Sequence, residues 1–284
     1  MPKSRRAHLW RRLLKRIQAI WCQLRWNLMG MRQRDLALVE RQEIYIVRRR
    51  DAYIGRDIFG TGTYEIEKLI QVLGHLPLGH KHTRLIDVGA NVGSICIPAV
   101  TRKMFHCSIA VEPEPTNFRL LQVNVILNDV QESIKCVQAA AGRDASTTLL
   151  LRLADRNFGD HQVVAEALPP DGPVVEVPTI TLDGLAQDWD SMADLIWMDV
   201  QGFEAVVLQG AEGALLEQVP ITMEFWPRRI SEFCSQDQFL RLLRGYSKYV
   251  DLGAVSEQHR DISELPGLYR KHLALNSSTD LLFL

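Results

Sequence analysis

Residues Leu85–Gly93 read LIDVGANVG, and this stretch decides the fold that we expect of the chain. A short apolar run ends at Asp87 and Val88, and a turn with two glycines leads into a second apolar run. Gly89 has no side chain, so the backbone turns tightly there and a ligand can approach it closely. Asn91 is one of the few other residues that tolerate a positive φ. The stretch therefore predicts a strand, a binding turn and a helix.

Short apolar strands and helices alternate on both sides of this stretch. We expect helices at 65–76, 92–103, 116–127 (capped by Thr116), 203–217 and 236–244, and strands at 44–47, 84–88, 108–111, 134–137, 174–177, 179–182, 195–198, 221–225 and 280–284. Residues 51–63 are predicted to be irregular, and Pro178 to interrupt the strand around it. The alternation predicts an α/β fold with a doubly wound, mostly parallel sheet. Ligands bind such sheets at the carboxyl ends of the strands, where the strand order reverses.

The composition is that of an ordinary globular protein. Of the 284 residues, 46% are hydrophobic and 24% are charged, which excludes wholesale disorder, collagen and a polytopic membrane protein. The five cysteines include no pair at C-x-x-C spacing. They form neither a disulfide framework nor a zinc motif, and so indicate a reducing, cytoplasmic compartment.

The first 42 residues are predicted to form a basic helical arm, and residues 43–284 a single domain. Residues 1–34 contain ten of the 33 lysines and arginines and no acidic residue. The rest of the chain contains the other 23 basic side chains and all 34 acidic side chains. If the arm is helical, one stripe along its surface consists of apolar side chains: Leu13, Leu14, Ile17, Ile20, Trp21, Leu24 and Leu28. No apolar run is long enough for a signal peptide or a membrane span.

Two hypotheses explain this arm. It lies on the anionic inner face of a membrane as a peripheral helix, or its stripe docks on its own body or on a second subunit in a homodimer. Nucleic acid is not expected as a partner, because no recognition motif accompanies the charge.

Acidic residues lie at the ends of three of the predicted strands. Glu112 ends the strand after Gly89, in the position from which a carboxylate accepts from ribose hydroxyls. Asp87 can accept from an ammonium group. Asp199, in the stretch Asp199–Glu204 (DVQGFE), is expected beside the Gly89 loop if the two strands are neighbours. Glu204 either belongs to the site or stabilises a helix N-terminus. Glu114 is expected to be solvated.

These motifs together resemble those of FkbM-type S-adenosylmethionine-dependent methyltransferases. The matching stretches are Leu85–Pro98 (LIDVGANVGSICIP), Val111–Asn128 (VEPEPTNFRLLQVNVILN), Thr181–Asp183 (TLD), Asp194–Ala211 (DLIWMDVQGFEAVVLQGA) and Asp280–Leu284 (DLLFL). The resemblance implies a class I methyltransferase (Rossmann-like) fold, with a seven-stranded sheet in which one strand near its end is antiparallel. It also implies S-adenosylmethionine as the cofactor, bound by Asp87, Gly89, Ala90, Asn91, Gly93, Glu112 and Asp199.

Two positions depart from the pattern of this family. Trp197 stands where the family usually has a lysine, and Gln201 where it has a glutamate. The loss of this lysine together with this glutamate has three alternative explanations. It preserves the charge balance, it alters the acceptor site, or it weakens catalysis. The alternative function is therefore an inactive or weakly active nucleoside-binding scaffold with the same fold.

The expected reaction is methylation of a hydroxyl on a small molecule or a glycan. Such an acceptor needs a base within hydrogen-bond reach, and three side chains are candidates: Asp199, His161 and Glu224. His161 is alternatively a surface-loop histidine, and Glu224 caps a helix or lines the acceptor pocket. No metal is expected, because His75, His80 and His82 lack a regular ligand spacing.

Overall fold

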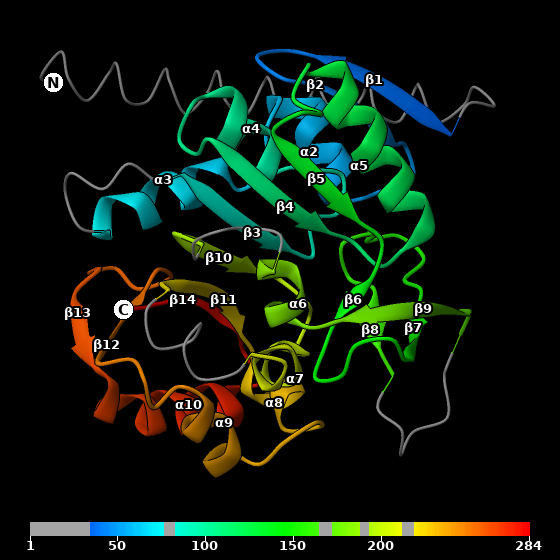
Figure 1. Ribbon diagram of the computed structural model, residues 1–284. Coiled ribbons are helices and arrows are strands. Elements are labelled where there is room, and N and C mark those ends of the chain that lie inside the picture. The colour runs from blue at the N-terminus through cyan, green and yellow to red at the C-terminus, as the bar shows by residue number, and fades with distance from the viewer. Residues whose placement is uncertain (1–34, 77–82, 165–171, 188–192, 212–218) are drawn as a thin grey trace, which may run out of the picture.

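A mostly parallel sheet forms the centre of the molecule. The computed structural model describes residues 35–76, 83–164, 172–187, 193–211 and 219–284 (Figure 1). Within them the sheet has the order β13-β12-β14-β11-β10-β3-β4-β5. Its strands are β3 (Arg84–Val88), β4 (Cys107–Val111), β5 (Ile134–Val137), β10 (Leu195–Met198), β11 (Ile221–Phe225), β12 (Lys248–Asp251), β13 (His259–Asp261) and β14 (Thr279–Phe283).

The strand directions confirm the predicted doubly wound fold. Strands β5, β4, β3, β10 and β11 are parallel, whereas β14 pairs antiparallel with both β11 and β12. The described sheet has eight strands instead of the expected seven. The additional one is β13, three residues at the edge beyond β12.

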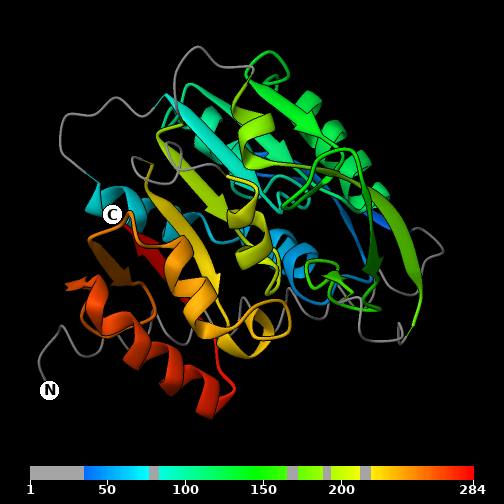
Figure 2. The same cartoon turned by 60° about the horizontal axis from the view of Figure 1, so that its bottom comes forward.

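Helices cover both faces of this sheet (Figures 1 and 2). They are α2 (Ile54–Thr61), α3 (Ile66–His75), α4 (Cys96–Thr101), α5 (Pro115–Leu127), α6 (Leu182–Ala186), α7 (Glu204–Gln209), α8 (Pro227–Ile230), α9 (Gln236–Leu242) and α10 (Leu265–Leu275). Alternate residues of β10 join different clusters: Leu195 and Trp197 pack with Leu69 of α3, whereas Ile196 and Met198 pack with α7, α9 and α10. Burial on both faces explains why the strand is apolar throughout.

A second, smaller sheet stands beside the first. It has the order β6-β9-β7-β8 and consists of β6 (Ala140–Ala141), β7 (Thr148–Arg152), β8 (Gln162–Val163) and β9 (Val174–Ile180). The interruption expected at Pro178 is wrong, because β9 runs through it. Pro178 pairs with Thr148 of β7, and β9 meets β6 only from Thr179 onward. The missing N–H therefore falls where the strand is an edge.

A hairpin precedes the large sheet. It consists of β1 (Leu36–Glu40) and β2 (Ile44–Arg48), so β1 lies in the stretch that the sequence assigned to the arm. Two asparagines of α5 complete the other edge of β2. Asn128 Oδ1 accepts from Ile44 N at 2.9 Å and Asn128 Nδ2 donates to Ile44 O at 2.7 Å, and Asn124 does the same for Ile46 at 2.7 and 3.2 Å. The two amides act as a neighbouring strand would.

Four further local expectations are wrong. Residues 51–63 contain α2, whose Ile54 and Ile58 are buried. The helix expected from residue 92 begins only at Cys96. Glu114 is buried and caps α5 in place of Thr116, because its side chain accepts from the backbone N–H groups of Thr116 and Asn117.

Residues 1–34, the predicted basic helix, lie outside the described residues. The second half of the helix predicted for 203–217 does so too, since α7 ends at Gln209 and residues 212–218 are not described. In the described part of the chain, no helix is both long enough and apolar enough to cross a membrane.

Candidate functional site

The strand order reverses between β3 and β10, and the predicted binding loop lies at this point. Val88 and Met198 are register partners, and Asp199 N donates to Val88 O at 3.0 Å. The expectation that Asp199 stands beside the Gly89 loop is thereby confirmed. Such a switch point is where doubly wound folds bind their ligands.

Gly89 is required by the closeness of the two strand ends. Its φ is +87°, and a Cβ there would lie 2.0 Å from Asp199 O. Gly89 N and Ala90 N both donate to Val111 O at 2.9 Å, which ties the loop to the end of β4. Gly93 also has a positive φ, and a Cβ there would lie 2.5 Å from Ile97 Cδ1. A side chain at Gly89 would clash with the Asp199 backbone, whereas one at Gly93 would be strained by the positive φ and would displace the Ile97 side chain.

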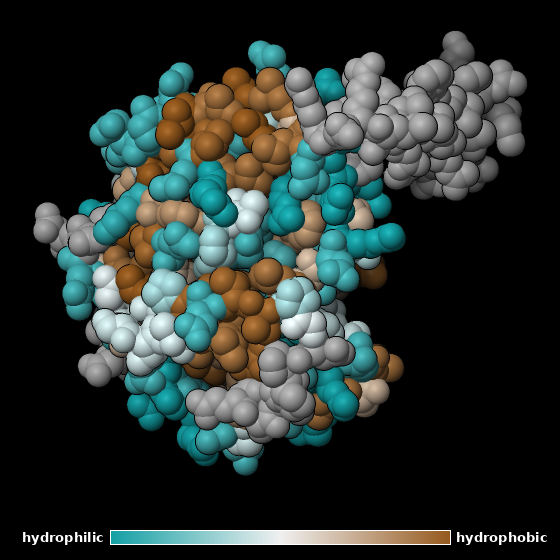
Figure 3. All heavy atoms as spheres, turned by 90° about the vertical axis from the view of Figure 1, so that its right-hand side faces the viewer, coloured by the Kyte–Doolittle hydropathy of each residue, from teal (hydrophilic) through white to brown (hydrophobic). Residues whose placement is uncertain are grey.

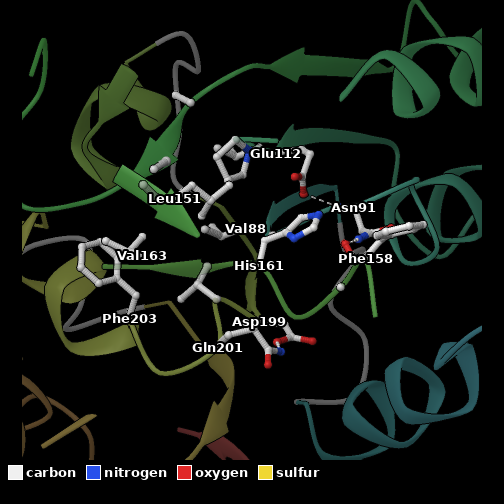
Figure 4. Close-up of a pocket in the computed structure, with 18 of the residues that line it drawn as sticks. Val88, Asn91, Glu112, Leu151, Phe158, His161, Val163, Asp199, Gln201 and Phe203 are labelled. Atoms are coloured by element: carbon white, nitrogen blue, oxygen red, sulfur yellow. Dashed lines mark hydrogen bonds between the residues drawn. The ribbon is translucent and has the colours of Figure 1, made fainter. Parts of the chain in front are cut away.

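Glu112 lies at the end of β4 and lines a pocket above this loop (Figure 4). Its Oε2 accepts from Asn91 N at 2.9 Å and its Oε1 from Glu114 N at 2.8 Å. Burial raises the pKa of Glu112 to about 8, against the lowering effect of these two hydrogen bonds. Each carboxylate oxygen retains a lone pair, so the group can still accept from a ligand.

Asp87 lies next to the loop but does not line this pocket. Its Oδ2 accepts from Cys96 N at 3.1 Å, at the start of α4. Burial raises the pKa of Asp87 to about 7. The carboxyl group thus stabilises the turn that carries Gly89.

His161 faces the pocket from the segment before β8 (Figure 4). Its Nδ1 accepts from Ala154 N at 3.0 Å, while Nε2 is buried and has no hydrogen-bond partner among the described residues. Burial lowers the pKa of His161, which favours the neutral ring. A neutral ring that accepts at Nδ1 carries its proton on Nε2. His161 therefore presents a donor to the pocket.

Phe158 was not predicted, yet it forms one wall of the pocket. Its carbonyl oxygen accepts from Asn91 Nδ2 at 2.8 Å and from Asn117 Nδ2 at 2.7 Å. The Arg48 guanidinium lies 3.5 Å from the centre of its ring. These contacts hold the segment with Phe158 and His161 against the binding loop. No spacing in the sequence connects the two segments.

The pocket has a volume of about 60 Å³. Its lining includes Val88, Gly89, Asn91, Val111, Glu112, Ala140, Leu151, Phe158, His161, Val163, Asp199, Gln201 and Phe203. Pockets for small molecules usually measure about 300 Å³ or more. A nucleoside-sized ligand therefore requires part of this wall to move.

Asp199 lines the pocket and also lies close to a second carboxylate, that of Glu224. Its Oδ1 accepts from Gln201 Nε2 at 2.6 Å. Burial raises the pKa of Asp199 well above its usual value, and the Glu224 carboxylate raises it further. Glu224, at the end of β11, lines a different cavity, and burial raises its pKa to about 7.

Glu204 and Trp197 serve the structure around Asp199. Glu204 Oε1 accepts from Val200 N and Gly202 N, both at 3.2 Å, and the side chain is fully buried. Trp197 is 4% exposed and packs against α3. Glu204 therefore fixes the turn after β10, and Trp197 belongs to the core.

The structure thus brings five predicted site residues together around one pocket: Gly89, Asn91, Glu112, His161 and Asp199. Asp87, Ala90, Gly93 and Glu224 lie outside its lining. Among the described residues, no group of three histidine, cysteine or acidic side chains could hold a metal ion.

Comparison with protein families gives one match. The model of the methyltransferase FkbM domain matches residues 87–249, more than half of the chain. This range begins at Asp87 and includes Glu112, His161, Asp199 and Glu224. No curated protein matches the chain significantly.

Several solved structures are similar in fold. The methyltransferase FkbM of Methylobacillus flagellatus has 17% identity and a TM-score of 0.46, and the match covers 74% of this chain and 45% of that one. The StiE O-MT fragment 961–1257 has 12% identity and a TM-score of 0.45, over 81% and 75% of the chains. TYW2 of P. horikoshii, solved with MeSAdo, has 12% identity and a TM-score of 0.42, over 88% and 72%.

Proposed function

The chain belongs to the family of FkbM methyltransferases, and from this premise we propose that it methylates a hydroxyl group with S-adenosylmethionine as the methyl donor. The observation that carries the proposal is the pocket at the switch point. There the Gly89 turn, the Glu112 carboxylate and the unpartnered Nε2–H of His161 face one space. This combination suits a ligand that has both hydroxyl donors and polar acceptors.

Three groups of the chain hold the nucleoside. Glu112 accepts from the ribose hydroxyls, because both its oxygens keep a free lone pair beside their backbone donors. Gly89 lets the ligand lie against the backbone. His161 donates from Nε2 to an acceptor atom of the ligand. Apolar contacts come from the β6 and β7 side of the pocket, including Ala140 and Leu151.

S-adenosylmethionine, when bound, supplies a methyl group on a sulfonium sulfur, which leaves as a neutral thioether when an oxygen takes the methyl. The chain then has to orient the acceptor hydroxyl and take its proton. We assign the proton to Glu224 ahead of Asp199, because burial and the Glu224 carboxylate raise the pKa of Asp199 well above its usual value and so favour its protonated form. A pKa of about 7 suits Glu224 to this role at neutral pH. His161 is the weaker candidate, because its only free nitrogen carries a proton.

Separate measurements of binding and turnover test this function. Titration calorimetry should show that S-adenosylmethionine binds. The methyl group should then appear on an oxygen of a product, as mass spectrometry after incubation with hydroxylated acceptors would show. A protein that binds neither the cofactor nor S-adenosylhomocysteine would contradict the proposal.

A binding scaffold without activity is the second candidate. Two observations favour it: Trp197 is a core residue that offers no charge, and the Gln201 amide occupies Asp199 Oδ1. Binding without turnover on any acceptor would identify it. In either case we place the protein in the cytoplasm, because the four cysteines of the described chain are free.

A further inference from the structure

The face of the sheet that α3 covers carries carboxylates at the carboxyl end of its strands. On β14, Leu282 packs with α3, whereas Leu281 and Phe283 pack on the other face. Because side chains alternate along a strand, Asp280 lies on the α3 side. Its register partner on β11 is Glu224, and directly paired residues share a face. The two carboxylates are therefore neighbours on the side of α3.

A third carboxylate, that of Asp199, follows β10. Met198, the residue before it, is the register partner of Met223, the residue before Glu224. The charges of Glu224 and Asp280 both raise the pKa of Asp199, as expected of close neighbours. Asp199 also lines the first pocket. The carboxylates of the α3 side therefore reach the place that we assign to the cofactor.

Lys68 of α3 is the cation of this group. Its Nζ lies 2.7 Å from Asp280 Oδ2 and 2.7 Å from Glu65 Oε1, and its side chain is 22% exposed. Among the described residues, no other cation forms an ion pair with these carboxylates or with Asp199 and Glu224. The Lys68 charge also lowers the pKa of Asp199 and that of Glu224. One lysine therefore acts on the whole group.

Glu65 helps to hold Lys68 in this position. It is the N-cap residue of α3, yet its side chain makes no capping bond and binds Lys68 instead. Its φ is +59°, in the left-handed region that few residues other than glycine adopt. Strain of this kind persists where the surrounding structure imposes it, and it is common at functional sites. The Lys68 side chain is thus fixed from two sides, by the start of α3 and by β14.

The charges around Glu224 oppose one another. Burial raises the pKa of Glu224 to about 7, and neighbouring acids add to the rise, whereas a hydrogen bond with Ser278 and the charge of Lys68 lower it. The acidic side chains that face it come from the end of β10, from α7 and from β14: Asp199, Glu204 and Asp280. A carboxyl group takes a proton from a hydroxyl only in its ionised form. Without Lys68, the charges around Glu224 would favour its protonated form.

We propose that Lys68 is a positioning residue of the methyl transfer, which holds Asp280 beside Glu224 and keeps the Glu224 carboxylate ionised for the proton of the acceptor hydroxyl. The proposal rests on the function proposed above. It also bears on Trp197, which stands where the family usually has a lysine and which packs with α3 on the same face. In this chain the cation comes from the helix instead of the strand. The loss of the strand lysine therefore does not leave the carboxylates without a cation.

Substitutions of Lys68 test this role without an acceptor. The full chain, labelled with carbon-13 at its glutamate carboxyl carbons and saturated with S-adenosylhomocysteine, would be titrated by NMR between pH 5 and 9. The Glu224 signal is the one that Glu224→Gln lacks. In Lys68→Met and Lys68→Gln its titration midpoint should rise by about one pH unit or more, whereas Lys68→Arg should keep it near that of the wild type. Two neutral variants are used so that one remains if the other fails to fold.

Lys103→Met is the matched control. Lys103 is exposed and lies between α4 and β4, hence at the amino end of the strands and far from the edge that carries Glu224. This substitution should leave the midpoint unchanged. A midpoint in the neutral Lys68 variants that equals that of the wild type, or falls below it, would overturn the proposal. So would a midpoint in Lys68→Arg that rises as far as in Lys68→Met, because the charge would then not be what Lys68 contributes.

The pH dependence of turnover gives a second readout, with an acceptor whose methylation the mass spectrometry described above detects. The acid limb of the kcat profile should move to higher pH in Lys68→Met and return in Lys68→Arg. A merely structural role of Lys68 would lower kcat by the same factor at every pH and leave the limb in place. That result would count against the proposal.

Cofactor binding separates this proposal from the function on which it rests. If the wild type binds neither S-adenosylmethionine nor S-adenosylhomocysteine, the proposed function fails, and the role of Lys68 in it fails too. If the wild type binds them and the midpoint of Glu224 does not depend on the charge at Lys68, only the role of Lys68 fails.

Discussion

At the residue scale, Glu112 gives the most direct test of the cofactor pocket. Glu112→Ala should weaken S-adenosylmethionine binding by about 1.5–3 kcal/mol, the range for hydrogen bonds to a charged group. Glu114→Ala is the control, because Glu114 caps α5 and does not line the pocket. It should cost about 1 kcal/mol of stability and weaken the affinity less than Glu112→Ala does, because the Glu114 charge acts on Glu112 only through space. Equal calorimetric affinities of the wild type and Glu112→Ala would remove Glu112 from the site.

Glu204 provides a test by pH. Burial raises its pKa from 4.5 to about 8, so between these values the folded chain holds a proton that the unfolded chain has released. A rise in pH therefore favours unfolding, by at most about 1.4 kcal/mol per pH unit. Gln at this position does not titrate. The free energy of unfolding of the wild type should thus fall relative to Glu204→Gln between pH 5 and 8, and the difference should level off above pH 8.

Urea unfolding of both proteins at several pH values measures this difference. A difference that stays constant from pH 5 to 9 would mean that Glu204 ionises in the folded chain as readily as in water. A difference with the opposite slope would mean that its neighbours stabilise the charged form.

At the scale of the elements, the pairing of α5 with β2 can be tested at Asn128. Asn128→Ala leaves the N–H and the C=O of Ile44 without their partners. Each loss should cost about 1–3 kcal/mol if water cannot replace it. Hydrogen exchange at Ile44 should accelerate by a corresponding factor. Ile126→Ala on the exposed side of the same helix should change the stability by less than about 0.5 kcal/mol. Equal effects of both substitutions would contradict the pairing.

The sequence predicts the elements whose signal is local. Strand β3 and the Gly89 turn follow from adjacent residues, and so does the position of Glu112 after β4. Helix α2 was missed because Gly55, Gly60 and Gly62 suggested irregular chain, whereas burial of Ile54 and Ile58 stabilises the helix. Tertiary packing there outweighs local propensity.

The parts of the site that depend on distant contacts could not be predicted. The role of His161 depends on the N–H of Ala154, which occupies Nδ1 and leaves the proton on Nε2. The alignment of Asp199, Glu224 and Asp280 depends on the register of three strands, one of which comes about 55 residues later in the chain. The alternation along a strand indicates which face each residue takes, but it does not say which strands distant in the sequence become neighbours.

At the scale of the whole molecule, the basic arm of residues 1–34 keeps its two hypotheses. If it lies on a membrane, binding to anionic vesicles should weaken as salt rises, because charges are screened over about 8 Å at physiological salt. Neutral vesicles should bind poorly. Deleting residues 1–34 should abolish co-sedimentation and preserve cofactor affinity, since the proposed contacts begin at Gly89.

If the arm docks on the protein, its deletion should instead lower the melting temperature and cause aggregation. The full chain should then show no salt-dependent binding to vesicles. Apolar residues gather on the side of the molecule where β1 and α5 lie (Figure 3). The exposed apolar side chains of these two elements are Leu36, Leu38, Val123 and Ile126. If the arm docks there, the protection of this surface from hydrogen exchange should depend on the presence of the arm.

Metal removal gives a further test at this scale. Exhaustive chelation should leave methyl transfer unchanged, because the proposed mechanism relies on positioning and on a protein carboxylate. Activity that is lost with EDTA and restored by Mg²⁺ would contradict it. The carboxylates of Asp199 and Glu224 would then be the first ligands to test.

The position of β14 between β11 and β12 affects how the chain reaches its final form. Both neighbours precede β14 during synthesis and run in the same direction, so each exposes an unpaired edge until residues 279–283 insert between them. A chain cut before Thr279 would leave these two edges free to pair with each other or with other molecules. Such a product should be captured by chaperones or degraded. Glu224 would also lack its register partner Asp280 in such a product.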